Sequence, residues 1–465
     1  MQASSTVDIV NARPGGIREL LSLAWPLIIS SSFSTIQITV DRAFAAQLGT
    51  DAASATTTAA MFFWTPFILL FSTSGYVSTF VAQYKGAGRP HKIGPIVWQG
   101  IYFSAFLGIA ILSLIPFRAH IFAMTGHTEQ VQQLECDFFG ALCWMGLPAL
   151  LTSVTCAFFS GLGNSRTVIW INVAGTIVNG LLDYAWVLGG WGFTQLGVAG
   201  AGWATTAASW VSALIGLALM FRKKYRMEFD LLVGWHFCSK TFLRLMRFGL
   251  PSGVQWFLDM TAFASFLSLT GRFGEAELAA SSLAYTINNF AFIPMFGLSQ
   301  AVSILVGQRL GENRPQIAEK SVRNAFVVCA IYMCTVVSMY SLFPSFCAWP
   351  FQDHNHPENW AAVFAKLKVL FYFIGAFAIF DSMTLMFSGA LRGAGDTLYV
   401  TLVSLSLAWP VMVLPTYLAV QNNWGLNWAW SFLSLYVALQ GLFYFRRFHG
   451  GKWKAMRVIE PEVID

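Results

Sequence analysis

The sequence predicts an all-α integral membrane protein with twelve transmembrane helices in two pseudo-symmetric six-helix bundles. The first observation is composition, since hydrophobic residues make up 56% of the 465-residue chain and charged residues only 11%. Soluble domains carry about a quarter charged residues, so much of this surface must face lipid. The second observation is a set of twelve long apolar stretches, and the third is an internal repeat spaced by 225 residues.

Each of the twelve stretches is long enough for a helix to cross the membrane, which takes about 20 apolar residues. Transmembrane β-barrels are excluded because the runs are unbroken and lack the alternation of a barrel strand. The predicted spans are approximately residues 20–48, 54–83, 94–117, 132–158, 167–190, 197–221, 244–271, 278–308, 322–345, 360–389, 398–419 and 425–445.

An internal repeat divides the chain into two halves. Residues 78–90 read STFVAQYKGAGRP and residues 303–315 read SILVGQRLGENRP, with six identical positions at an offset of 225. Pro26 and Pro251 share this offset, and the tripeptide Phe159-Ser160-Gly161 returns 228 residues later. The unit is far longer than a solenoid repeat. Two apolar repeats of this length are typical of transporters, with a site between or within the halves.

The distribution of Lys and Arg predicts that both termini lie in the cytoplasm. With the N-terminus inside, predicted cytoplasmic segments contain all but five of the 28 Lys and Arg residues, the exceptions being Arg42, Arg118, Arg272, Lys366 and Lys368. This asymmetry follows the positive-inside rule and requires an even number of spans. It explains the net charge of +6, so we expect no nucleic-acid partner.

Segments outside the spans are short. We expect an N-terminal bundle at residues 1–221, a basic cytoplasmic linker at 222–243, a C-terminal bundle at 244–447 and a cytoplasmic tail at 448–465. The first 19 residues lack an apolar core, so we expect no cleavable signal peptide. Short loops and the lack of an Asn-x-Ser/Thr site favour a bacterial inner membrane.

Several other functions are disfavoured by the residue pattern. The seven cysteines lack metal-ligand spacing, and the seven histidines fall outside the middle of the spans, so we expect neither a metal centre nor a histidine proton relay. The glycine-rich turns at 86–88 and 393–395 lack the strand and the GK[ST] sequence of nucleotide loops. We expect no cofactor apart from a coupling ion. No HExxH or GxSxG motif occurs, so we expect no enzyme activity.

Four carboxylates lie well inside apolar stretches, namely Asp41, Asp183, Asp259 and Asp381. A charge in hydrocarbon costs several kcal/mol, so such residues usually face a cavity and have a function. The alternative for each is a structural ion pair or a position near a helix end. Asp41 adjoins Arg42, although adjacent helical residues point about 100° apart and need not pair.

Asn179 and Asp183 are one helical turn apart and share a face. They offer an amide oxygen and a carboxylate, the hard donors that suit Na⁺ or a proton. In the next stretch, Thr205 and Thr206 follow a face of small residues that suits close helix packing. A polar clamp between helices, without a role in transport, is the alternative. Aromatic residues that could line a cavity for aromatic or cationic ligands include Phe63, Trp64, Phe290 and Phe292.

In combination, these features resemble the multidrug and toxic compound extrusion (MATE) family over nearly the whole chain. The resemblance is carried by ITVDRAFAAQLG, by FVAQYKGAG with its partner LVGQRLGEN, by IVNGLLDY and by SGALRGAGDT. It implies two six-helix lobes, a cavity between them, and export driven by inward movement of Na⁺ or H⁺.

The resemblance also implies roles for individual residues. The cation-linked cluster of the N-terminal lobe would be Asp41, Asn179, Asp183 and Thr205, and the acids of the C-terminal lobe would be Asp259 and Asp381. Na⁺ could bind either group. The chain departs from some relatives at three places. Asp259 stands where NorM-type exporters usually carry Glu, Phe377 stands where some carry Tyr, and Arg42 beside Asp41 is a cation that some relatives lack.

The resulting hypothesis is a monomeric antiporter that exports amphipathic organic cations in exchange for H⁺ or Na⁺, with small organic cations and membrane lipids as partners. The main alternative is a flippase for lipids or lipid-linked oligosaccharides, which has a similar helical plan. A flippase for a pyrophosphate-linked substrate would favour Arg and Lys in the cavity, whereas the deep charges here are mainly acidic. A membrane-embedded enzyme is a more remote alternative.

Overall fold

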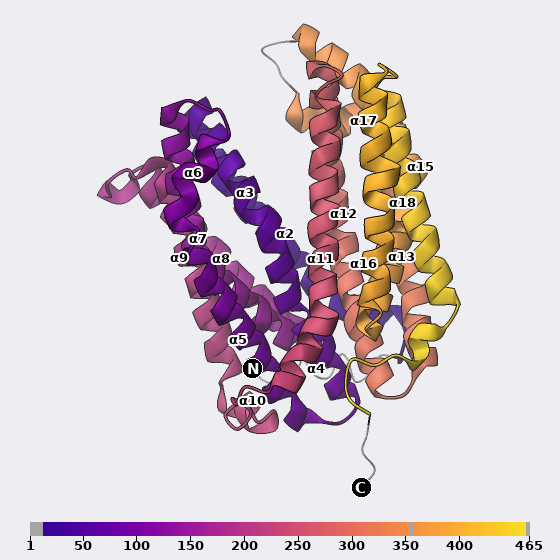
Figure 1. Ribbon diagram of the computed structural model, residues 1–465. Helices are drawn as coiled ribbons and strands as arrows, with labels where there is room; N and C mark the ends of the chain where they lie inside the picture. Colours follow the sequence, from indigo (N-terminus) through magenta and orange to yellow (C-terminus); the bar gives the residue numbers. More distant parts are fainter. Residues whose placement is uncertain (1–12, 353–356, 462–465) are drawn as a thin grey trace. The chain divides into compact units, whose positions relative to one another are not determined.

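The predicted fold class is confirmed by the computed structural model in Figure 1, which describes residues 13–352 and 357–461. Over these residues the regular structure is entirely helical. Each predicted span coincides with a helix or a consecutive helix pair. They are α2 (Ile17–Gln47), α3 (Thr50–Gly75) with α4 (Val77–Gly86), α5 (Ile93–Leu112), α7 (Glu129–Gly161), α8 (Ser165–Val187), α9 (Gly197–Met220), α11 (Ser239–Thr270), α12 (Glu275–Gly311), α13 (Pro315–Leu342), α15 (Pro357–Ala394), α16 (Thr397–Leu407) with α17 (Leu414–Gln421), and α18 (Leu426–His449).

Three short helices lie in the connections, namely α6 (Arg118–Ala123), α10 (Lys223–Glu228) and α14 (Pro344–Ala348). Within the described residues, ten helical stretches are long and apolar enough to cross a membrane. The other two predicted spans, α11 and α18, are less apolar because they contain Gln255, Asp259 and Gln440 together with several Trp and Tyr residues. Their polar side chains meet in one network, described below.

The sequence repeat is also a repeat of backbone conformation. Arg89 (φ −113°, ψ 62°) and Arg314 (φ −118°, ψ 62°) adopt nearly the same angles, and each precedes a proline that starts the next helical segment. One residue earlier, the chain is left-handed at both Gly88 and Asn313. Asn tolerates this conformation better than most residues, which explains how it replaces glycine here.

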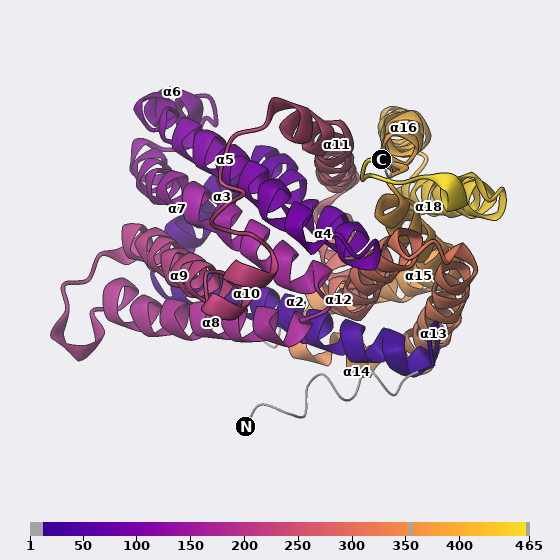
Figure 2. The same ribbon diagram turned by 90° about the horizontal axis from the view of Figure 1, so that it is seen from below.

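The N-terminal unit comprises Ile29–Gly253 together with the described residues from Val458 onwards. Its central element is α7, which packs against α3, α4, α5, α8 and α9. Figure 2 shows α4, α5 and α7 side by side. Most of α7 is buried, because it carries apolar and small residues on nearly every face. The surrounding helices can therefore pack around it.

The C-terminal unit comprises the described residues up to Ile28 together with Val254–Arg457. Its central element is α15, which packs against α12, α13 and α18 (Figure 1). Because α7 and α15 hold the repeated Phe-Ser-Gly tripeptide, the two units are built around corresponding helices. The linear domain boundaries expected above stay a prediction.

Two helices each contribute to both units. The division falls after Ile28 in α2 and after Gly253 in α11, positions separated by the repeat offset. Each lies two residues after a proline inside the helix, Pro26 or Pro251. Proline lacks an N–H group and crowds the preceding turn, so it weakens a helix locally.

A π-helical segment, Ala408–Val413, joins α16 to α17. It contains Pro410, and the wider turn is a common way to accommodate a residue that cannot donate to the helical ladder. The corresponding helix of the N-terminal unit, α8, contains no proline and runs without a break. The two units therefore differ locally in the helices that hold polar site residues.

Candidate functional site

In the N-terminal unit, the four residues predicted to form a cation-linked cluster come together. We call Asp41, Asn179, Asp183 and Thr205 the Asp41 cluster. They come from α2, α8 and α9. Asn179 and Asp183 are completely buried, which agrees with their predicted position on one face of α8. The Asp41 carboxylate lies beside the other three side chains.

The Asp41 cluster has polar atoms without hydrogen-bond partners. They are Oδ1 of Asp41, both amide atoms of Asn179 and both carboxylate oxygens of Asp183, all buried. The Thr205 hydroxyl lies 3.4 Å from Oδ2 of Asp41 and 2.9 Å from the carbonyl oxygen of Ala201, which is the nearer acceptor. Buried polar atoms are nearly always partnered, so this cluster is exceptional.

Two neighbouring carboxylates removed from water repel one another when both are charged. Protons or a bound cation would relieve this repulsion. The Asp41 cluster offers carboxylate, amide and hydroxyl oxygens, which are the ligands that hard cations prefer. Its composition therefore suits both ions considered for coupling, H⁺ and Na⁺.

A polar contact between α8 and α2 also lies two turns away from the Asp41 cluster. Asn172, two turns before Asn179 on α8, donates a hydrogen bond to the Ser30 hydroxyl of α2. This bond joins the two helices that carry Asp41 and Asp183. Arg42 is exposed, and it forms no ion pair with any acid in the described part of the chain. It therefore does not neutralise Asp41 directly.

In the C-terminal unit, Asp259 lies in a hydrogen-bond network that we call the Asp259 network. Its Oδ1 accepts from the Ser404 hydroxyl and from the Tyr436 hydroxyl, the latter at 3.0 Å. Its Oδ2 accepts from Nε2 of Gln255 at 3.3 Å. These partners come from α11, α16 and α18. Asp259 is therefore much better partnered than the acids of the Asp41 cluster.

The network continues along α18. Gln440 donates from Nε2 to the hydroxyl oxygens of Tyr436 (3.1 Å) and Tyr444 (3.3 Å). Tyr444 in turn donates to the carbonyl oxygen of Val400 at 3.0 Å. Tyr436, Gln440 and Tyr444 are buried, and each takes part in at least one hydrogen bond. Gln440 and Tyr444 therefore hold Tyr436 in place against Asp259.

Asp381 does not join the Asp259 network. It lies on α15, half-buried and near Cys329 of α13, and none of the described residues donates a hydrogen bond to it. The two predicted acids of this unit are therefore in different surroundings. Arg392, eleven residues further along α15, is within electrostatic range of Asp259 and stacks over the Trp256 ring at 5.4 Å.

Ser404, Tyr436 and Gln440 were not among the site residues predicted from the sequence. A signal was present for two of them, because Tyr436, Gln440 and Tyr444 recur every four residues on one face of α18. Of the aromatic candidates, Phe63 is a core residue, 3% exposed and stacked on Phe67 at 4.9 Å. Phe290 is exposed, and its side chain is 53% accessible.

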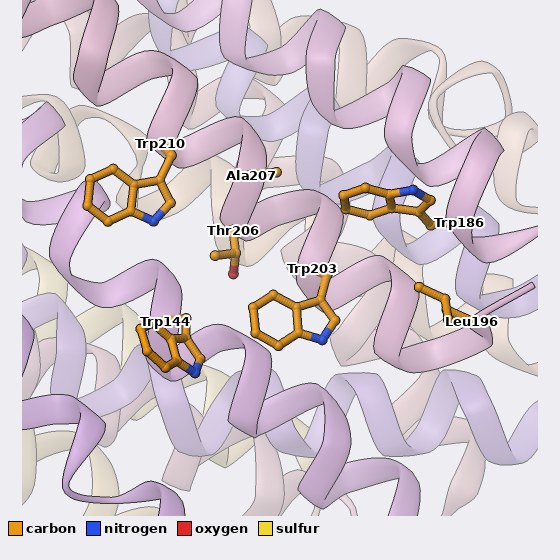
Figure 3. Close-up of a pocket in the computed structure, with 7 residues that line it drawn as sticks. All are labelled: Trp144, Trp186, Leu196, Trp203, Thr206, Ala207 and Trp210. Atoms are coloured by element: carbon orange, nitrogen blue, oxygen red, sulfur yellow. The ribbon is translucent and has the colours of Figure 1, made fainter. Parts of the chain in front are cut away.

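An aromatic groove lies elsewhere on the N-terminal unit, and Figure 3 shows its side chains. Its volume is about 360 Å³, and Thr206 and Ala207 of α9 are among its lining residues. Four indoles surround it, those of Trp144, Trp186, Trp203 and Trp210. Trp144 and Trp203 are 47% and 42% exposed, so the groove opens on the outer surface of the unit. The acids of the Asp41 cluster do not line it.

Comparison with known proteins gives consistent matches along the chain. The MatE family model matches residues 26–185 and 251–418, which is more than half of the chain. The chain is 26% identical to a probable multidrug resistance protein NorM from Rhizobium meliloti, over 88% of each protein. It is 24% identical to a protein of the same description from Thermotoga maritima, over 96% of this chain and 95% of the relative.

Solved structures show the same fold. A crystal structure of MATE in complex with MaL6 superposes with a TM-score of 0.87 at 19% identity, covering 97% of this chain and 100% of the other. A MOP superfamily transporter from Pyrococcus furiosus superposes with a TM-score of 0.86 at 19% identity, covering 98% and 100%. The two-lobe arrangement of twelve helices predicted above agrees with this fold.

Proposed function

Because the chain belongs to the MatE family of multidrug and toxic compound extrusion transporters, we propose that it is an antiporter that exports amphipathic organic cations in exchange for H⁺ or Na⁺. The observation that carries the proposal is the Asp41 cluster, where Oδ1 of Asp41 and both carboxylate oxygens of Asp183 are buried in a membrane bundle without a hydrogen-bond partner. The multidrug resistance description of the relatives supports the substrate class.

The exchange follows from the charge of the cluster. When the carboxylates are charged, they attract an organic cation, and apolar walls remove its rings from water. Entry of H⁺ or Na⁺ neutralises the same carboxylates and weakens their attraction for the organic cation. Drug and coupling ion would therefore compete, which is the requirement for antiport.

We place the protein in the cell inner membrane with both termini in the cytoplasm. The proposal rests on the concentration of Lys and Arg in alternate connections and the adjoining helix ends, including residues 222–247 around the linker and residues 446–457 at the end of α18 and in the tail. In this orientation, α8 ends and α9 begins near the outer surface. The Asp41 cluster, at the middle and outer part of these helices, would exchange ions with the outside.

The test is ethidium efflux from liposomes that contain the purified protein, under an imposed Na⁺ gradient and separately under a pH gradient. Efflux driven by one gradient identifies the coupling ion. Asp41→Asn and Asp381→Asn should each abolish coupled efflux while the protein remains folded. Asp51→Asn, which removes an exposed carboxylate at the start of α3, is the matched control and should transport normally.

Two outcomes would contradict the proposal. Full coupled efflux by both Asp41→Asn and Asp381→Asn would show that these acids are not required. No efflux under either gradient, with the protein shown to be folded, would favour a flippase. A lipid-scrambling assay in the same liposomes would then be the next measurement.

A further inference from the structure

A short segment of the tail, Val458–Glu460, packs into the N-terminal unit. We call it the tail segment. Val458 is 1% exposed and Ile459 is 9% exposed, and both belong to the apolar core that includes Leu245. The backbone N–H of Val458 donates to Oε1 of Gln83 at 2.9 Å. Gln83 is itself completely buried, so this bond is protected from water.

Glu460 binds a set of basic and hydroxyl groups from the same unit. Its carboxylate accepts from the Tyr84 hydroxyl at 2.7 Å and forms an ion pair with Arg244. Lys92 lies 4.0 Å from the other carboxylate oxygen, and Arg89 donates to the Glu460 carbonyl oxygen at 3.0 Å. Tyr84 and Arg89 come from the first repeated motif, Lys92 from the turn that follows it, and Arg244 from the first turns of α11.

In the second repeat, the tail contributes basic side chains, Lys454 to Glu319 and Arg457 to Asn313, and the carboxylate comes from a helix. There, Arg309 forms an ion pair with Glu19 at the start of α2. At the repeat offset of 225, Arg309 corresponds to Tyr84 and Glu19 corresponds to Arg244. The first repeat therefore lacks a carboxylate at both positions. Glu460 supplies that carboxylate from the tail segment.

We propose that Gln83, Tyr84, Arg89, Lys92 and Arg244 form a peptide-binding site whose ligand is the chain's own tail segment. The site selects for the composition of the tail segment, which is two apolar side chains followed by a carboxylate. Arg457 belongs to the C-terminal unit and Val458 to the N-terminal unit. The chain therefore passes from one unit to the other a third time at this point, in addition to α2 and α11.

The first experiment measures amide hydrogen exchange of the full-length protein in lipid nanodiscs, following a peptide that covers residues 456–461. We expect the wild-type Val458 amide to be protected. Glu460→Gln and Gln83→Ala should each accelerate its exchange at least ten-fold. Glu228→Gln removes an exposed carboxylate from α10 and should leave exchange unchanged. Equal exchange in wild type and Glu460→Gln would overturn the proposal.

A double variant tests whether Glu460 takes the place of an ion pair that the second repeat has and the first repeat lacks. Tyr84→Arg combined with Arg244→Glu rebuilds in the first repeat the ion pair found between Glu19 and Arg309. The new ion pair between positions 84 and 244 should displace Glu460. The amides of the tail segment should then exchange as fast as in Glu460→Gln, while the amides of α7 stay protected. A tail segment that stays protected in this variant would overturn the proposal. Because exchange does not depend on transport, either result is separate from the test of antiport.

Discussion

At the scale of single residues, the acids of the two units differ in how well they are partnered. Asp183 is buried with both oxygens unpartnered, whereas Asp259 accepts hydrogen bonds from three side chains. Hydrogen bonds to a buried carboxylate offset the cost of removing it from water, so binding of an added cation stabilises it less. The Asp41 cluster is therefore the stronger candidate for ion coupling, and the Asp259 network is the stronger candidate for a structural role.

Tyr436→Phe tests that structural role. It removes the hydroxyl that donates to Asp259 and accepts from Gln440. Loss of a hydrogen bond to a charged or buried group costs about 1–3 kcal/mol, so the thermal unfolding temperature should fall. The control is Tyr372→Phe on α15, whose ring is 65% exposed. Equal unfolding temperatures for the two variants would show that the network adds no stability.

The buried acids could be predicted from the sequence because a carboxylate in a long apolar run stands out locally. Their partners could not, since Ser404 and Tyr436 are distant in sequence and Ser and Tyr are common in helices. Only packing decides that α11, α16 and α18 meet. For the same reason, the sequence could not separate Asp381 from Asp259, because both have equally apolar neighbours in the chain.

At the scale of elements, backbone contact between helices explains several glycines. A Cβ on Gly393 of α15 would lie 2.3 Å from the carbonyl oxygen of Ser303 on α12. A Cβ on Gly161 of α7 would lie 2.6 Å from the carbonyl oxygen of Ser78 on α4. Ser78 and Ser303 are equivalent in the repeat. Close approach at this serine is therefore a feature of both units.

Gly393→Ala should destabilise the protein because neither backbone can move without disturbing the helix pair. Overpacking typically costs about 1–3 kcal/mol. Gly180→Ala on α8 is the matched control, since a Cβ there would meet nothing within 4 Å. It should be neutral or stabilising by up to about 1 kcal/mol, because alanine favours helix more than glycine does. Thermal unfolding checks both; a stable Gly393→Ala protein would contradict the packing argument.

The docked tail segment should respond to acid. Burial raises the pKa of Glu460, but the Tyr84 hydrogen bond, a backbone hydrogen bond and the charges of Arg244 and Lys92 outweigh it and hold the pKa below the ordinary value of 4.5. Arg89 also contacts this residue, through its carbonyl oxygen. A lowered pKa stabilises docking above about pH 4.5, and this stabilisation is lost as pH falls through the folded-state pKa.

Hydrogen exchange of residues 456–461, corrected for intrinsic rates, measures this response. Protection should be constant between pH 7 and pH 5 and should fall in more acidic buffer. In Glu460→Gln, the acid-dependent part should vanish. If the wild-type tail segment stays equally protected at pH 3 while the rest of the protein is folded, the carboxylate does not hold it.

At the scale of the whole molecule, the proposed orientation can be tested with one native cysteine. Cys238 is exposed in the connection before α11. The Thr241 hydroxyl, 3.4 Å from its Sγ, donates a hydrogen bond that lowers the pKa of the thiol. A lowered pKa increases the reactive thiolate fraction at neutral pH.

A membrane-impermeant maleimide should therefore label Cys238 in inside-out vesicles and not in intact cells. Cys238→Ser is the control that identifies the labelled residue by mass spectrometry. Labelling of Cys238 in intact cells would place the connection outside and reverse the proposed topology. The twelve-helix plan would be unaffected, since it rests on the helices themselves.

The two units exchange segments, and this has a consequence for synthesis on the ribosome. The N-terminal unit obtains its last contacts only when residues 458–460 have been made, which is after all of the transmembrane helices. Conversely, the first turns of α2 must wait for helices made hundreds of residues later before they reach their own unit. Neither half can finish folding during translation of its own stretch of messenger RNA. Both are completed only after residues 458–460 have been made, and a ribosome that stalls in the second half leaves two incomplete bundles.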